Sequence, residues 1–134
     1  MIDAHQQLTK KWWNMHHHQF ELFVSPLVLR EATVGNPTMA QRRLRIVREL
    51  PVLVLTAEAT AVAGQLMKNG PLPPKAEMDA LHIGVAAVHG IEYLLTWNCR
   101  YIANARTRSQ IESICRNMGY EPPVMCTPEE LTEE

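Results

Sequence analysis

The sequence predicts an α/β domain with a mainly parallel sheet. Helix and strand patterns alternate along the whole chain, and short apolar runs of strand length are separated by helical segments with clear start and stop signals. The 134 residues fit one domain, placed at 1–134, which buries about two-thirds of its unfolded surface. With 46% hydrophobic and 20% charged residues, the composition is that of a globular chain and excludes a disordered one.

The N-terminal half is expected to hold three helices and two strands. The spans are a helix over 2–18, a strand over 20–24, helices that begin at Ser25 and Asn36, and a buried strand over 52–55. The last two helices share one start signal, a side chain that can cap a helix followed directly by proline. The capping oxygen accepts an early backbone N–H and proline fixes a helical φ, so this pair favours a first turn.

The C-terminal half continues the alternation. The spans are a helix over 57–69, a stiff proline loop over 71–74, a helix from Asp79 that stops at Gly90, a strand over 92–96, a mostly helical segment over 100–118 that stops at Gly119, a strand over Val124–Cys126 and a capping-box start over 127–130. In the helix from Asp79, apolar residues recur at Leu81, Val85 and Val88, which is the spacing of one helix face.

Charge is distributed unevenly along the chain. The net charge is −1, yet 13 Lys and Arg stand against 9 Asp and Glu up to residue 116, and the remaining five acids follow without a base. Four arginines crowd one predicted helix, namely Arg42, Arg43, Arg45 and Arg48. The planar donors of arginine match phosphate oxygens, so Arg42 and Arg43 are candidates for RNA contact. A solvated helix face is the alternative.

The spacing of the cysteines and the length of the apolar runs bear on the cellular compartment of the protein. Cys99, Cys115 and Cys126 form no CxxC pair and leave an odd number, which fits a reducing cytoplasm better than a disulfide scaffold. The apolar runs are shorter than the roughly 18 residues of a membrane span, and no signal-peptide pattern opens the chain. We therefore expect a cytoplasmic protein without a membrane partner.

The histidine and tryptophan residues near the N-terminus give weaker indications of a functional site. His16, His17 and His18 are consecutive, and consecutive helical side chains point about 100° apart, so they do not converge on one metal ion. Trp12 and Trp13 could stack on bases, but the apolar residues around them favour a core position for at least one.

Two polar side chains bracket the segment over 78–100. Asp79 opens a helix and Asn98 follows the next strand, and in an α/β sheet these two places lie at the same edge, where active sites of open sheets collect. Their oxygens suit hard divalent cations. Alternatively, Asp79 complements the helix dipole and Asn98 caps the following helix.

Three motifs follow one another in the chain. They are Phe23 to Glu31, a strand and then a helix that carries a glutamate; Asp79-Ala-Leu-His-Ile with the later run Leu94-Leu-Thr96-Trp-Asn98-Cys-Arg100; and Pro123 to Leu131, a strand and a short terminal helix. Together they resemble the PIN domains of VapC-type toxins, over nearly the whole chain.

The resemblance implies a three-layer α/β/α domain that acts as a metal-dependent endoribonuclease. Mg²⁺ or Mn²⁺ would be held by Glu31, Asp79 and Asn98, with Thr96 supporting the pocket and Arg100 contacting RNA phosphate. It also implies a homodimer and an antitoxin whose tail blocks the acidic pocket.

One departure from the family pattern affects these expectations. PIN domains begin with a central strand that ends in an acid, whereas residues 1–7 resemble the helix that follows it, and Asp3 has no strand before it. We therefore expect that a segment upstream of Met1 or a partner chain completes the sheet, and that the chain is feebly active or inactive. The alternative function is a non-catalytic, decayed PIN domain that binds protein or RNA.

Overall fold

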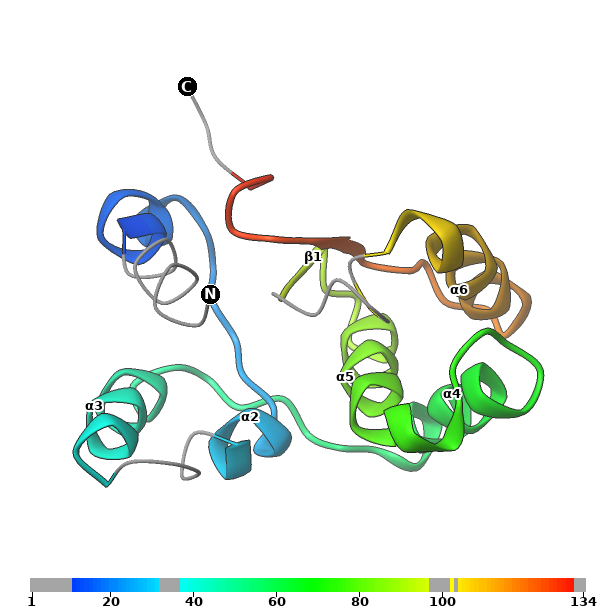
Figure 1. Cartoon of the computed structure of the whole chain (residues 1–134), viewed down its shortest axis with the longest axis horizontal. Helices are drawn as coiled ribbons and strands as arrows, with labels where there is room; N and C mark the ends of the chain where they lie inside the picture. The colour runs from blue at the N-terminus through cyan, green and yellow to red at the C-terminus, as the bar shows by residue number, and fades with distance from the viewer. Residues whose placement is uncertain (1–10, 32–36, 97–101, 103, 132–134) are drawn as a thin grey trace.

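The chain folds into a mixed arrangement of helices with a small parallel sheet (Figure 1). The computed structural model describes residues 11–31, 37–96, 102 and 104–131. Residues 11–16 are helical, and the further elements are η1 (His17–Gln19), α2 (Pro26–Glu31), α3 (Pro37–Val47), α4 (Ala57–Lys68), η2 (Pro74–Ala76), α5 (Glu77–Val88), β1 (Tyr93–Leu95), α6 (Ala105–Asn117) and β2 (Val124–Cys126). A mixed helix-and-strand fold with a parallel sheet is confirmed, and helix and strand alternate as predicted from α5 to β2.

The hydrophobic core lies where α4, α5 and α6 meet the strands. These three helices stand together at the right of Figure 1, while α2 and α3 lie at the left. The main buried side chains of this core are Val62, Leu66, Leu72, Ile83, Ile111, Cys115 and Met125. They come from all three helices, from the proline loop and from β2, so one core joins the segments from 57 to 126.

The sheet pairs β1 with β2 in parallel. Tyr93 stands opposite Val124 and Leu95 opposite Cys126, and Thr96 extends the pairing by donating its N–H to the Cys126 carbonyl at 2.9 Å. The predicted strand over 124–126 is confirmed at both ends, and the one predicted over 92–96 is one residue shorter at each end.

The two predicted N-terminal strands are reduced to one parallel bridge. Val24 donates its N–H to the Pro51 carbonyl at 3.0 Å and accepts from the Leu53 N–H at 2.7 Å. The rest of 20–24 and 52–55 carries no strand pairing. The prediction of full strands there is corrected, because an extended apolar run forms a strand only when a neighbour lies alongside it over several residues.

Two glycines end their helices as the sequence predicts. Gly90 has φ of 68° and Gly119 has φ of 91°, a region that costs L-residues with a side chain. After α5, Ile91 donates to the Ala86 carbonyl at 2.9 Å; after α6, Tyr120 donates to the Cys115 carbonyl at 2.9 Å. Both are Schellman turns, which satisfy the last carbonyls of a helix and turn the chain toward the next segment.

Trp12 attaches the N-terminal helix to the C-terminal segment. Its side chain is 5% exposed, and its indole N–H donates to the Leu131 carbonyl. The ring also stacks on Phe20, with 5.8 Å between the ring centroids. The expected core position of one tryptophan is confirmed, since Trp13 is only half-buried and stacks on His17.

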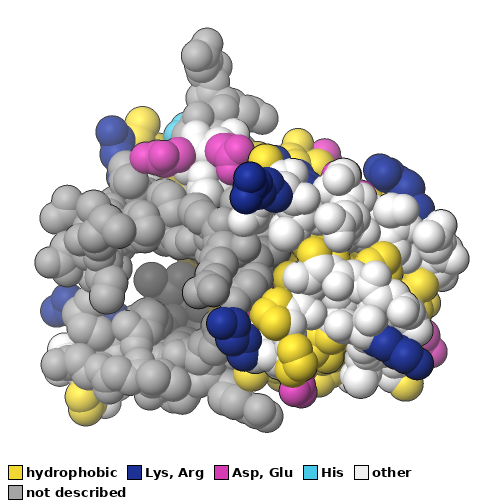
Figure 2. All heavy atoms as spheres, turned by 45° about the vertical axis from the view of Figure 1, so that its right-hand side comes forward, with side chains coloured by type: hydrophobic (Ala, Val, Ile, Leu, Met, Phe, Trp, Pro, Cys, Tyr) yellow, Lys and Arg dark blue, Asp and Glu magenta, His cyan; other side chains and the backbone are white. Residues whose placement is uncertain are grey.

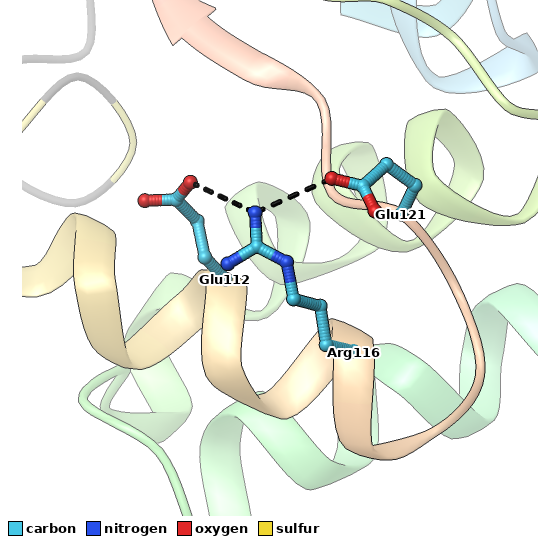
Figure 3. A network of polar contacts seen from close by, with 3 residues as sticks. All are labelled: Glu112, Arg116 and Glu121. Atoms are coloured by element: carbon cyan, nitrogen blue, oxygen red, sulfur yellow. Dashed lines mark hydrogen bonds and ion pairs between the residues drawn. The ribbon is translucent and has the colours of Figure 1, made fainter.

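A surface ion-pair network joins α6 to the segment before β2 (Figure 3). The Arg116 guanidinium lies 3.8 Å from Glu112 and 3.3 Å from Glu121. Arg116 and Glu121 are largely exposed and Glu112 is partly exposed, so each pair contributes at most about 1 kcal/mol to stability.

None of the helices within the described ranges has the length and hydrophobicity to cross a membrane.

Candidate functional site

Asp79 lies in the first turn of α5. The proline loop leads into η2, and α5 begins at Glu77 without a side-chain cap, so Glu77 and Asp79 place two carboxylates at the positive end of the helix dipole. The Asp79 side chain is partly exposed and takes part in a polar interaction. The prediction that Asp79 opens its helix is confirmed.

Thr96 lies directly after β1. Its backbone N–H is fixed by the bond to Cys126, and its side chain is partly buried. Thr96 also takes part in a further polar interaction. It therefore occupies the end of the strand where the predicted pocket would begin.

The other predicted site residues are described less fully. Asn98 and Arg100 lie outside the described residues. Glu31 is the last residue of α2, but its side chain lies outside the described parts. The structure thus gives side-chain surroundings for Asp79 and Thr96 only among the predicted pocket residues.

The described residues do not provide a complete set of ligands for a metal ion. No group of three His, Cys, Asp or Glu side chains among residues 11–31, 37–96, 102 and 104–131 is placed to hold one. This part of the chain offers Asp79 as a single predicted carboxylate ligand, which by itself does not fit a Mg²⁺ site.

The arginines at the start of α6 are not among the site residues predicted from the sequence. Asn104 caps this helix by accepting the Arg106 N–H at 2.8 Å, so Arg106 and Arg108 fall in the first turn, shortly after β1. Within the described part of the chain, the buried Nε of Arg108 has no hydrogen-bond partner. An asparagine followed two and four residues later by arginine could have indicated this capped, basic helix start.

The arginine-rich helix lies away from these elements. Arg42 and Arg45 of α3 and Arg48, which directly follows this helix, are exposed to solvent, and Arg45 and Arg48 line a hollow of about 490 Å³. Arg43 belongs to α3, but its side chain lies outside the described parts. On the opposite side of the molecule, Figure 2 shows Lys and Arg side chains that stand apart from one another, with hydrophobic side chains between them. Among the side chains that are coloured in this view, the basic ones therefore do not form one patch.

A second hollow lies between the N-terminal segment and β1. It measures about 370 Å³ and is lined on one side by residues 19–23 and on the other by 90–93 and Leu95, with Trp12 and Leu131 at its floor. At one end the rings of Phe20 and Tyr93 meet edge to face, with 6.1 Å between their centroids. The two segments thus meet at their aromatic residues and leave a space beside them.

The cysteines with described surroundings are inert. Cys115 and Cys126 are free thiols and buried. Burial raises the pKa of the Cys115 thiol to about 11, and burial, with a smaller effect from Glu130, also raises the pKa of Cys126. A buried thiol that stays protonated is a poor nucleophile and a poor metal ligand, so the surroundings of Cys115 and Cys126 do not favour a catalytic role.

Comparison with known protein families, with curated proteins and with solved structures finds no match for this chain.

Proposed function

We propose that the chain is a PIN-like endoribonuclease domain that hydrolyses RNA phosphodiesters. The observation that carries the proposal is the placement of Asp79 in the first turn of α5, the helix before β1, with Thr96 directly after the end of that strand. A helix joined to the next strand by a tight turn runs antiparallel to it. The helix start and the strand end then fall at one edge of the sheet.

The parallel pairing of β1 with β2 through α6 supports this reading. Parallel strands joined by a helix carry their functional groups beyond their carboxyl ends, which is where Thr96 lies. The finer architecture, three α/β/α layers of the PIN kind, is part of the proposal.

Mg²⁺ or Mn²⁺ belongs to the proposal as cofactor, with Glu31, Asp79 and Asn98 as its ligands. When bound, the ion would polarise the phosphodiester and lower the pKa of an attacking water. Among the chain's own groups, Arg106 and Arg108 at the start of α6 would contact RNA phosphate, together with Arg100, Arg42 and Arg43. A cytoplasmic location, a homodimer and a cognate antitoxin are part of the same proposal.

A second candidate function is a non-catalytic module that binds protein or RNA. The hollow beside β1 favours it, because an unfilled space between two extended segments is a place for a partner. It differs from the first candidate in one measurable property, since it requires no Asp79 carboxylate.

The experiment is cleavage of a structured RNA in Mn²⁺ by the chain and by two matched variants. Asp79→Asn removes a charge from the first turn of α5 and keeps the side chain's shape. Glu77→Gln removes a charge from the same turn at an exposed position. The proposal expects cleavage that EDTA and Asp79→Asn abolish and Glu77→Gln preserves. Equal loss in both variants would show a general effect of charge, and no cleavage by the chain itself would favour the binding module.

A further inference from the structure

The hollow between residues 19–23 and β1 is bordered on one side by the extended segment that leads to the bridge at Val24 and on the other by β1. Val24 uses both its N–H and its C=O to pair with the segment at Val52. Successive residues of an extended chain point their backbone groups to opposite sides, so the backbone of Phe23 faces away from that partner. Phe23 also lines the hollow.

The same alternation applies to β1. Glu92 accepts from the Val124 N–H at 2.8 Å and Thr96 donates to Cys126, so the even-numbered residues of this strand face β2. Leu95 therefore turns its N–H and C=O away from β2, and Leu95 lines the hollow from the other side. The hollow is therefore bordered by the backbone of Phe23 on one side and by the backbone of Leu95 on the other.

The lining of this space includes aromatic side chains, and two exposed acids also border it. Trp12, Phe20 and Tyr93 contribute aromatic surface, and Phe23 is 41% exposed. Glu21 and Glu92 lie at the rim with exposed side chains. An unpaired strand edge beside exposed apolar surface is a template for another strand, and native proteins normally cover such edges.

We infer that this hollow receives an extended, apolar peptide strand that carries a basic residue at its end. Its backbone would bond to Phe23 on one side and Leu95 on the other, joining the two parallel pairs into one sheet. Its alternate apolar side chains would cover the aromatic wall, and the basic residue would pair with Glu21 or Glu92. This inference concerns a partner and does not depend on ribonuclease activity.

The test uses a capped peptide, Lys-Val-Thr-Val-Tyr-Val-Lys, and the same peptide with its central valine replaced by proline. Proline cannot donate to a ladder, so it removes a backbone bond while it keeps the composition nearly constant. Binding is measured by calorimetry, and hydrogen exchange of the Phe23 and Leu95 amides is measured by NMR. We expect saturable one-to-one binding, slower exchange of both amides, and affinity weaker by about tenfold for the proline peptide.

The role of the two acids is tested by measuring peptide binding to the variants Glu92→Gln and Glu21→Gln. The control is Glu58→Gln, which alters an exposed acid in the first turn of α4. Each rim variant should weaken binding by about two- to fivefold at low salt, and Glu58→Gln should leave it unchanged. Absence of saturable binding, equal binding of both peptides, or unchanged exchange at Phe23 and Leu95 would overturn the inference. Slow exchange at these amides in the peptide-free protein, with dimers in sedimentation, would also overturn it and assign the space to a second copy.

Discussion

Gly84 of α5 lies against the carbonyl group of Ala59 in α4. A Cβ atom at position 84 would lie 2.3 Å from the Ala59 oxygen, a distance that no real contact of this kind reaches. Ala59 and Gly84 are both buried. Helices α4 and α5 therefore pack this closely against each other because position 84 has no side chain.

The replacement Gly84→Ala should destabilise the fold. The added methyl group meets backbone, which cannot rotate away, so α4 and α5 must separate and loosen the core that they share. We expect the free energy of unfolding to fall by about 1–3 kcal/mol, measured by urea denaturation.

Gly64 provides the matched control for Gly84. It also lies inside a helix, α4, but a Cβ atom there would meet nothing within 4 Å. Gly64→Ala should raise the free energy of unfolding by about 0.5–1 kcal/mol, because alanine restricts the unfolded chain and favours the helix. Similar effects of the two replacements would contradict the close approach of α4 and α5.

The Schellman turn after α6 should depend on Gly119. Its φ of 91° is costly for a residue with a Cβ atom, and asparagine tolerates this region better than alanine. Gly119→Ala should lower stability by about 1–2 kcal/mol and Gly119→Asn by roughly half as much. Thermal denaturation of both variants checks the order, and a more stable alanine variant would show that the turn does not form.

Trp12 should contribute more to the free energy of unfolding than its neighbour Trp13. Trp12→Phe keeps an aromatic ring on Phe20 but loses the bond to the Leu131 carbonyl, so stability should fall by about 1 kcal/mol or more. Trp13 is only half-buried and Trp13→Phe keeps a ring beside His17, so its effect should be smaller. Urea denaturation followed by circular dichroism compares them, and a larger loss for Trp13→Phe would contradict the anchoring role of Trp12.

The buried thiol of Cys115 should make stability depend on alkaline pH. Its pKa is raised from 9.0 to about 11 by burial, so the unfolded chain releases this proton at lower pH than the folded one. Stability that is complete below pH 9.0 should therefore fall by about 2–3 kcal/mol as the pH rises to about 11. Cys115→Ala should lower stability at every pH yet flatten this decline, which urea denaturation at several pH values would detect. An equal slope in both proteins would show that Cys115 does not cause it.

Local signals in the sequence predicted the C-terminal elements well. The helix predicted over 57–69 matches α4 to within one residue, and glycines at 90 and 119 end α5 and α6 because only glycine takes those φ values without cost. The strand at Val124–Cys126 follows from a short apolar run bounded by prolines and threonine.

Features that depend on distant contacts were harder to predict. The segments at 20–24 and 52–55 read as strands, but only Val24 and Val52 find each other, because pairing depends on neighbours that local patterns do not specify. The approach of Gly84 to Ala59 also depends on tertiary packing, although the many small residues of α4 and α5 are a usable signal. At the candidate site, the sequence located Asp79 and Thr96 but not the capped arginines at the start of α6.

The central claim, that Asp79 belongs to a ribonuclease site, is tested most directly by comparing RNA cleavage by the unaltered chain, Asp79→Asn and Glu77→Gln in Mn²⁺, at equal folded concentration established by circular dichroism. The account predicts cleavage that survives Glu77→Gln, falls by about a hundredfold or more in Asp79→Asn, and disappears with EDTA. Cleavage by Asp79→Asn at the rate of the unaltered chain would contradict the claim.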